Sequence, residues 1–168
     1  MRFAPAMFVV LWSSGFIGAK FGLPAAPPAT FLVIRFVGVL ALMIPIALAV
    51  RAPWPADWRQ VAHIAVAGLL VQAGYLGGVF FAIDRGMSAG LAALIVSLQP
   101  ILTAVAAAPL LRERVSARQW LGLALGLGGT VLVVADKLSI AGLTLVAIGY
   151  ALIALASMTA GTLYQKRY

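Results

Sequence analysis

The chain has 168 residues, of which 64% are hydrophobic and 10% are charged, and its mean hydropathy is +1.09. This composition is typical of an integral membrane protein and excludes a soluble domain with a large core. The net charge of +8 comes from cations that lie between apolar runs and form no continuous stripe, so they predict membrane topology and not nucleic-acid binding. The lack of cysteine and the single histidine exclude disulfides, thiol chemistry and a self-contained zinc site, and we expect no metal and no cofactor.

Six apolar segments predict an all-α integral membrane fold with six transmembrane helices, because each is near the roughly 20 residues that a helix needs to cross a bilayer. The predicted spans are 3–22, 30–50, 60–83, 88–111, 119–135 and 140–163. Polar side chains stand where several of these helices would begin, and such groups satisfy the unpaired backbone N–H groups there. Asp57 with Gln60 and Ser116 with Gln119 have the spacing of a capping box, and Ser88, at the start of the fourth span, is a candidate cap for that helix.

The basic residues predict the orientation, because positively charged loops tend to stay in the cytoplasm. With the N-terminus inside the cell, only Arg85 and Lys137 fall clearly on the outer side, each beside an aspartate. The cations on the cytoplasmic side are then Arg2, Arg51, Arg59, Arg112, Arg114, Arg118, Lys166 and Arg167. We therefore expect a multi-pass protein of the bacterial inner membrane with both termini in the cytoplasm.

An internal repeat is one interpretation of the first and last spans. Gly15 aligns with Gly161 and Lys20 with Lys166, although a match this short also arises by chance. A true repeat gives a five-helix unit over 1–138 and the first helix of a second unit over 139–168. An odd number of helices forces the second copy to be inverted in the membrane, which is a recurring plan of secondary transporters.

Several segments in order resemble the first EamA domain of the drug/metabolite transporter superfamily. They are WSSGFIGAKFGLP, FLVIRF, GLLVQAGYLGGVFFAI, GMSAGLAALIVSLQPILTA and LLRERVSARQWLGLALGLGGTVLVV, and they cover roughly residues 6–135. The final helix is similar to the opening of a second EamA domain. The resemblance implies a ten-helix transporter of two inverted domains that exports metabolites such as amino acids, and the chain departs from that pattern by ending at Tyr168.

Two cations, Lys20 and Arg35, are the only charges inside predicted spans, and both lie toward the outer side. One interpretation is that they reach the outer headgroups or pair with Asp84. The other is a vestibule that attracts a substrate carboxylate or phosphate, for which Arg35 is better suited because its guanidinium binds a carboxylate through two hydrogen bonds. All four acids lie at span ends or in loops, which argues against the efflux of lipophilic cations coupled to protons.

Polar residues within the spans are candidates for substrate binding. Gln72 and Tyr75 are three residues apart, and Gln99 and Thr103 four apart, so each pair shares a helical face. Together they would line a polar cavity near the middle of the membrane, or they would serve as hydrogen bonds between packed helices. For Gln99 we favour the cavity, because Pro100 bends the helix there and frees a backbone carbonyl.

The first and fifth spans add further candidates. Ser13 and Lys20 share a face of the first helix, and Ser13 joins the predicted substrate-binding set. Gly122 and Gly126 form a GxxxG step, which lets helices approach closely in lipid. This step serves either packing within one bundle or a homodimer.

Together these features predict a transporter that exports a small anionic or zwitterionic metabolite, such as an amino acid, by alternating access. Its partners would be the lipid bilayer, the small-molecule substrate, and either a second copy of the chain or a missing second half, with no nucleic acid. The alternative is a truncated, non-transporting membrane protein, or a half-transporter that works only as an oligomer. An enzyme is disfavoured, since no nucleophile, base and orienting group have a spacing that brings them together.

Overall fold

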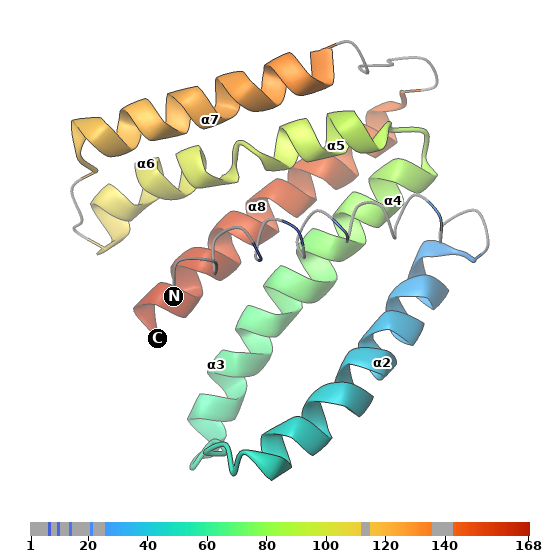
Figure 1. Ribbon diagram of the computed structural model, residues 1–168, viewed down its shortest axis with the longest axis vertical. Coiled ribbons are helices and arrows are strands. Elements are labelled where there is room, and N and C mark those ends of the chain that lie inside the picture. Colours follow the sequence, from blue (N-terminus) through green and yellow to red (C-terminus); the bar gives the residue numbers. More distant parts are fainter. Residues whose placement is uncertain are drawn as a thin grey trace. The chain divides into compact units, whose positions relative to one another are not determined.

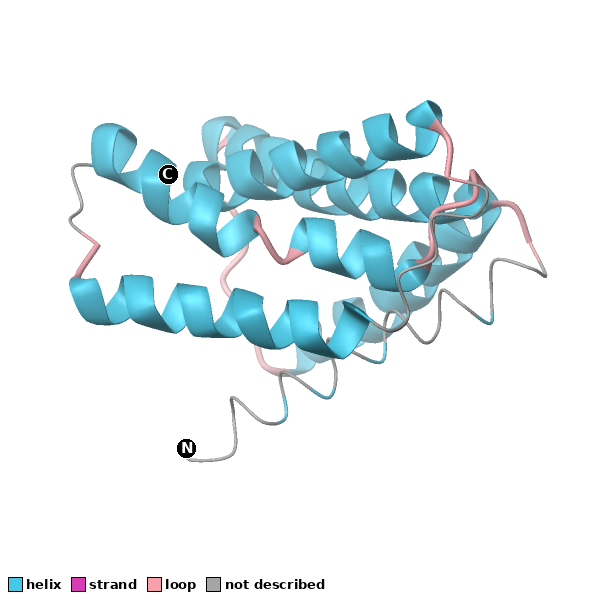
Figure 2. Ribbon diagram, turned by 90° about the horizontal axis from the view of Figure 1, so that it is seen from above, coloured by secondary structure: helices cyan, strands magenta, loops and turns pink. Residues whose placement is uncertain are grey.

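The computed structural model describes residues 26–111, 115–135 and 143–168, together with Met7, Val10, Ser14 and Phe21. Over these residues the fold is all-helical, with short connections between the helices (Figure 2). The chain divides into two compact units, Met1–Ala52 and Pro53–Tyr168, which we describe separately.

The first unit contains α2, Pro28–Ala49. Pro28 occupies the first helical position, where its missing N–H would have had no partner in any case. The helix is 22 residues long and its apolar side chains are mostly exposed within the unit. Such a helix is suited to contact with lipid along much of its length.

The second unit begins with α3, Trp58–Gly68, whose start follows from local chemistry. The Asp57 carboxylate accepts a hydrogen bond from the backbone N–H of Gln60 at 2.8 Å, and the Gln60 amide oxygen accepts one from the N–H of Ala56 at 3.0 Å. The helix continues without interruption into η1, the π-helix Leu69–Gly77, and then α4, Gly78–Asp84. The three form one apolar run of 27 residues, long enough to cross a bilayer.

Three further elements precede the last helix. The fourth predicted span is divided into α5, Ala89–Val96, and α6, Gln99–Leu111, and the Ser88 hydroxyl caps α5 at the N–H of Leu91, 3.2 Å away. α7, Ala117–Ala135, starts with the predicted capping box. In it Ser116 and Gln119 bind each other's backbone N–H groups at 2.7 and 3.3 Å.

The last helix, α8, spans Leu145–Arg167 and is capped by the Thr144 hydroxyl on the N–H of Ala147 at 3.1 Å. This helix begins five residues after the predicted start near residue 140, which itself lies outside the described residues. Four segments have the length and apolar composition to cross a membrane, and they coincide with the second, third, fourth and last predicted spans. α7 coincides with the fifth. The first predicted span lies largely outside the described residues, so the six-helix count and the inverted repeat stay predictions.

α8 is the centre of the second unit. It contacts α3, η1, α4, α5 and α6, and Figure 1 shows it running beside the α3–α4 rod and beside α5 and α6. Small residues permit the close approach. A Cβ added to Gly78 would lie 2.7 Å from the Tyr150 carbonyl oxygen, and one added to Gly74 would lie 2.5 Å from the Ser157 hydroxyl oxygen. Because no hydrophobic force drives helices together in lipid, such close packing is the main source of their association.

This packing predicts that Gly78→Ala destabilises the protein and that Gly77→Ala does not. The added methyl at Gly78 meets backbone and must push α8 away, whereas a Cβ at Gly77 meets no described atom within 4 Å. We expect a loss of about 1–3 kcal/mol at Gly78, and no loss at Gly77, where alanine improves helix propensity. Thermal unfolding of the purified variants in detergent measures the difference. Equal melting temperatures for the two variants would contradict the packing described here.

Candidate functional site

The first candidate site is built around the break in the fourth predicted span. α5 ends at Val96, and α6 begins at Gln99 after a two-residue turn. Within the turn the Ser97 hydroxyl donates to the Leu94 carbonyl at 2.6 Å. Pro100 is the second residue of α6, in the first turn, where a helix needs no backbone N–H. The sequence thus leaves Gln99 at the N-terminus of a half-helix.

The Gln99 side chain joins two helices. Its amide nitrogen donates to the Thr103 hydroxyl at 2.9 Å within α6 and to the Thr162 hydroxyl at 3.2 Å on α8. Thr162 in turn donates its proton to the Met158 carbonyl at 2.8 Å, which orients its oxygen to accept from Gln99. Gln99 is partly exposed, so the same side chain that bridges the helices also meets open space.

That space is a pocket of about 410 Å³ between α6, α7 and α8. Its volume lies in the range of small-molecule sites. Among the described residues, the lining combines apolar side chains with a few polar ones and one cation, and it contains no acidic residue. The lining residues are Gln99, Pro100, Thr103, Ala104, Ala107, Val115, Gln119, Leu123 and Lys166.

The pocket brings together some predicted residues and separates others. Gln99, Pro100 and Thr103 line it, as their shared face predicts. Gln72 and Tyr75 lie on η1 and are absent from its lining; Gln72 is exposed, and Tyr75 is only 3% exposed.

The other predicted site residues lie elsewhere. Arg35 is an exposed residue of α2 in the first unit, and Lys20 and Ser13 fall outside the described residues. Gly122 and Gly126 are exposed on α7, where an added Cβ would meet no described atom within 4 Å. The close contacts involve Gly74, Gly78 and Gly161 instead.

Sequence reasoning missed two polar groups in this lining. Gln119 was assigned to helix capping and Lys166 to membrane topology, yet both face the pocket. The alignment of Lys166 with Lys20 was the only available signal for the lysine. The role of Gln119 depends on α7 folding back beside α6, which a single-sequence pattern does not specify.

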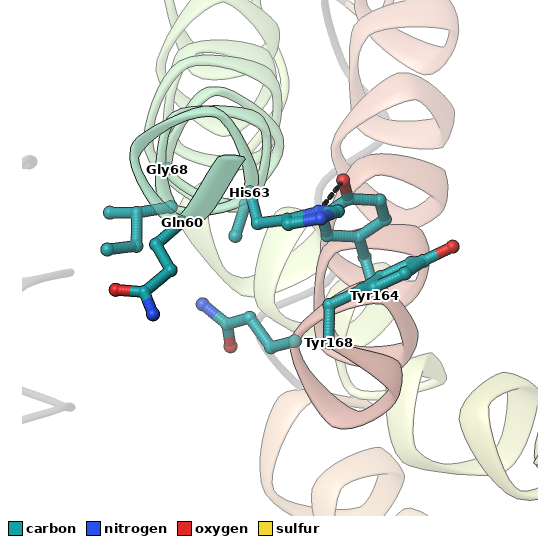
Figure 3. A pocket seen from close by; sticks show the side chains of 8 residues that line it. Gln60, His63, Gly68, Tyr164 and Tyr168 are labelled. Carbon is teal, nitrogen blue, oxygen red and sulfur yellow. Dashed lines mark hydrogen bonds between the residues drawn. The ribbon is translucent and has the colours of Figure 1, made fainter. Parts of the chain in front are cut away.

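A second pocket of about 520 Å³ lies between α3 and α8 (Figure 3). His63 Nδ1 is hydrogen-bonded to the Tyr164 hydroxyl at 2.6 Å, and the Tyr168 ring stacks on His63. The sequence contains a single histidine, and its two partners lie 101 or more residues away from it in the sequence. No periodicity within one helix reveals such a pair.

The comparisons with known proteins agree with the fold. The chain is 27% identical over 161 residues to the "Probable amino-acid metabolite efflux pump" of Escherichia coli (strain K12), covering 96% of this chain and 52% of that protein. It is also 27% identical over 165 residues to the protein of the same name from Salmonella typhimurium, covering 98% of this chain and 53% of that one. The "Uncharacterized transporter sll0355" of Synechocystis is 28% identical over 123 residues, covering 73% of this chain and 37% of its own length.

The chain spans about half the length of the efflux pumps it matches. No solved structure matches it. Residues 4–135 match the EamA-like transporter family, and together with the apolar helices this match makes the chain a multi-pass membrane protein. The chain belongs to the EamA-like transporter family.

Proposed function

We propose that this protein exports a small anionic or zwitterionic metabolite, such as an amino acid, across the bacterial inner membrane by alternating access. The pocket beside Gln99 is the observation that carries the proposal. It combines a broken helix, uncharged hydrogen-bonding groups and a lysine, and none of the described residues that line it is acidic. Two relatives named as amino-acid metabolite efflux pumps support the substrate class.

The electrostatics of the pocket favour a carboxylate. Gln99 and Pro100 at the start of α6 line it, so the positive end of the helix dipole lies at its wall. Transporters commonly use the ends of discontinuous helices in this way to hold anionic substrate groups. Lys166 adds positive potential to the same pocket.

Each predicted site residue has a role in this proposal. Gln99 contacts the substrate and Pro100 maintains the break, while Lys20 and Arg35 attract the carboxylate from the outer side. Gln72, Tyr75 and Ser13 complete the substrate-binding set. Because Tyr75 is buried, its contact with substrate requires the helices around it to separate during the transport cycle.

The proposed assembly has two inverted repeats, with 1–138 as the first and 139–168 as the start of the second, and both termini in the cytoplasm. The central position of α8 in the second unit supports this plan, because a helix of the second repeat then completes the packing of the first. The remaining helices would come from a second copy of this chain or from the missing second half. Gly122 and Gly126, exposed on α7, are available for that contact.

The role of Arg35 predicts that Arg35→Ala raises the KM for amino-acid export by roughly tenfold or more, the value of one charge-assisted hydrogen bond. Arg35→Lys should recover part of the loss, because it retains the charge and loses the two-pronged geometry. Export of a radiolabelled amino acid from preloaded membrane vesicles gives the KM. Arg59→Ala removes an exposed cation elsewhere and serves as the control. Wild-type kinetics in Arg35→Ala would exclude Arg35 from the site.

The role of Gln99 predicts different results for stability and transport. A double-mutant cycle of Gln99→Leu and Thr162→Val, measured on the free energy of unfolding, should give a coupling energy of only about 0.6 kcal/mol between the two side chains. Export should fall more than tenfold in Gln99→Leu and stay near wild type in Thr162→Val, which leaves Gln99 its bond to Thr103. If the two single variants lose export equally, Gln99 acts through helix packing and not through substrate contact.

A further inference from the structure

The pocket between α3 and α8 is distinct from the pocket beside Gln99, since the two share no lining residue. It is larger, at about 520 Å³, and it lies where the start of α3 faces the end of α8. Its walls combine amide, imidazole and phenol groups with a small apolar surface. The lining residues are Gln60, His63, Ile64, Ala67, Gly68, Tyr164, Gln165 and Tyr168.

A cluster of three rings joins the two helices at this pocket. The hydrogen bond between His63 Nδ1 and the Tyr164 hydroxyl is 2.6 Å long and links α3 to α8 (Figure 3). The Tyr168 ring stacks on His63 with a centroid distance of 4.4 Å and an interplanar angle of 14°, and lies 4.9 Å from the Tyr164 ring. The histidine is thus held to α8 by one hydrogen bond and by ring contacts with Tyr164 and Tyr168.

The packing of α8 changes along its length. At the level of Gly78 and Gly74 the helices approach so closely that an added Cβ would meet Tyr150, Ala154 or Ser157 within 3 Å. At the level of Gly68 an added Cβ meets no described atom within 4 Å, and the pocket occupies the space. The α4 end of this long helix is therefore closely packed on α8, while the α3 end is bridged by the ring cluster.

The segment between α3 and α4 is the π-helix η1, Leu69–Gly77. π-helical turns are rare, are usually short, and occur often at functional sites. This π-helix is itself closely packed on α8, since a Cβ added to Gly74 would meet Ser157 and one added to Gly161 would lie 2.6 Å from Val71. The loosely packed part of the long helix is therefore α3, and its movement away from α8 would leave the contacts at Gly74 and Gly78 in place.

We propose that this pocket is the vestibule through which the metabolite reaches the transport path from the inner face, with the His63–Tyr164 pair as its latch. The inference rests on the proposed export function and narrows its substrate class. None of the described residues that line the pocket is Asp, Glu, Lys or Arg, so these side chains offer a ligand with net charge no counter-charge for the hydration that it loses. The amides of Gln60 and Gln165 beside an apolar floor fit a zwitterion with no net charge.

The latch is tested without any transport assay, because the chain contains no cysteine. Ala67→Cys places a single thiol in the pocket wall, where the native side chain is 6% exposed. Tyr164→Phe in this background removes the hydroxyl and keeps the ring. A membrane-impermeant maleimide applied from the inner face should then label the thiol about fivefold faster, the change expected for losing one ordinary hydrogen bond.

The matched control is Tyr150→Phe in the same Ala67→Cys background. It makes the same chemical change on α8, at the closely packed end where Tyr150 stacks on Phe81, and should leave the labelling rate unchanged. Equal rates in all three proteins, or labelling only from the outer face, would overturn the latch. Protection of the thiol by a neutral amino acid supports the vestibule, and equal protection by a dicarboxylate of similar size would overturn the proposed selectivity.

A second experiment connects the latch to export. His63→Cys with Tyr164→Cys, joined by a short bifunctional thiosulfonate, should stop export, and a reductant should restore it. The control pair, Phe81→Cys with Tyr150→Cys, joins α4 to α8 at rings 5.4 Å apart and should leave export intact. Continued export with the first pair joined would overturn the latch. A wild-type protein that exports nothing overturns the proposed function instead, while the labelling test of the latch remains valid.

Discussion

The close approach of α8 to its neighbours is the constraint on which the second unit depends. In a bilayer, helix association comes from packing and hydrogen bonds, because lipid is as apolar as the side chains. Gly74, Gly78 and Gly161 let the backbones of α8 and the α3–α4 rod come close enough for such contacts. A methyl group at Gly78 would force α8 away from the carbonyl of Tyr150, and the bonds that α8 makes to other helices would lengthen with it.

Both pockets lie where this packing is interrupted. On one side of α8 the break between α5 and α6 leaves Gln99 and Pro100 beside open space. On another side the α3 end of the rod borders the larger pocket, while η1 and α4 pack closely on α8. Irregular backbone at membrane depth is tolerated where it is buried in protein or lines a cavity. The break between α5 and α6 therefore lies where the neighbouring pocket accommodates it, and η1 lies where α8 covers it.

Much of the fold follows from the sequence alone. Hydropathy locates the spans, the polar residues Asp57 and Ser116 locate helix starts, and Pro100 locates the break before α6. These features depend on residues close together in the chain, so local rules are sufficient. α8 begins five residues after its predicted start, where Thr144 provides the cap.

The features that local rules do not provide depend on which faces meet. Gly122 and Gly126 form the most recognisable packing motif, yet the close contacts in the described chain involve Gly74, Gly78 and Gly161. Gln119 and Lys166 face the pocket only because α7 and α8 both lie beside α6, and His63 meets Tyr164 only because α3 lies against α8. None of these pairings leaves a periodic signal in a single helix.

Counterflow in reconstituted vesicles is the most direct test of the central claim, that this protein moves small zwitterionic or anionic metabolites across a membrane. Vesicles containing the product of the native gene are loaded with an unlabelled amino acid and diluted into a trace of the labelled one. Because this assay measures exchange of substrate across the membrane, it can be carried out before the coupling ion is identified. The account predicts transient accumulation of label that is absent from protein-free vesicles. No accumulation with any neutral amino acid or small carboxylate, from a folded and correctly inserted protein, would contradict it.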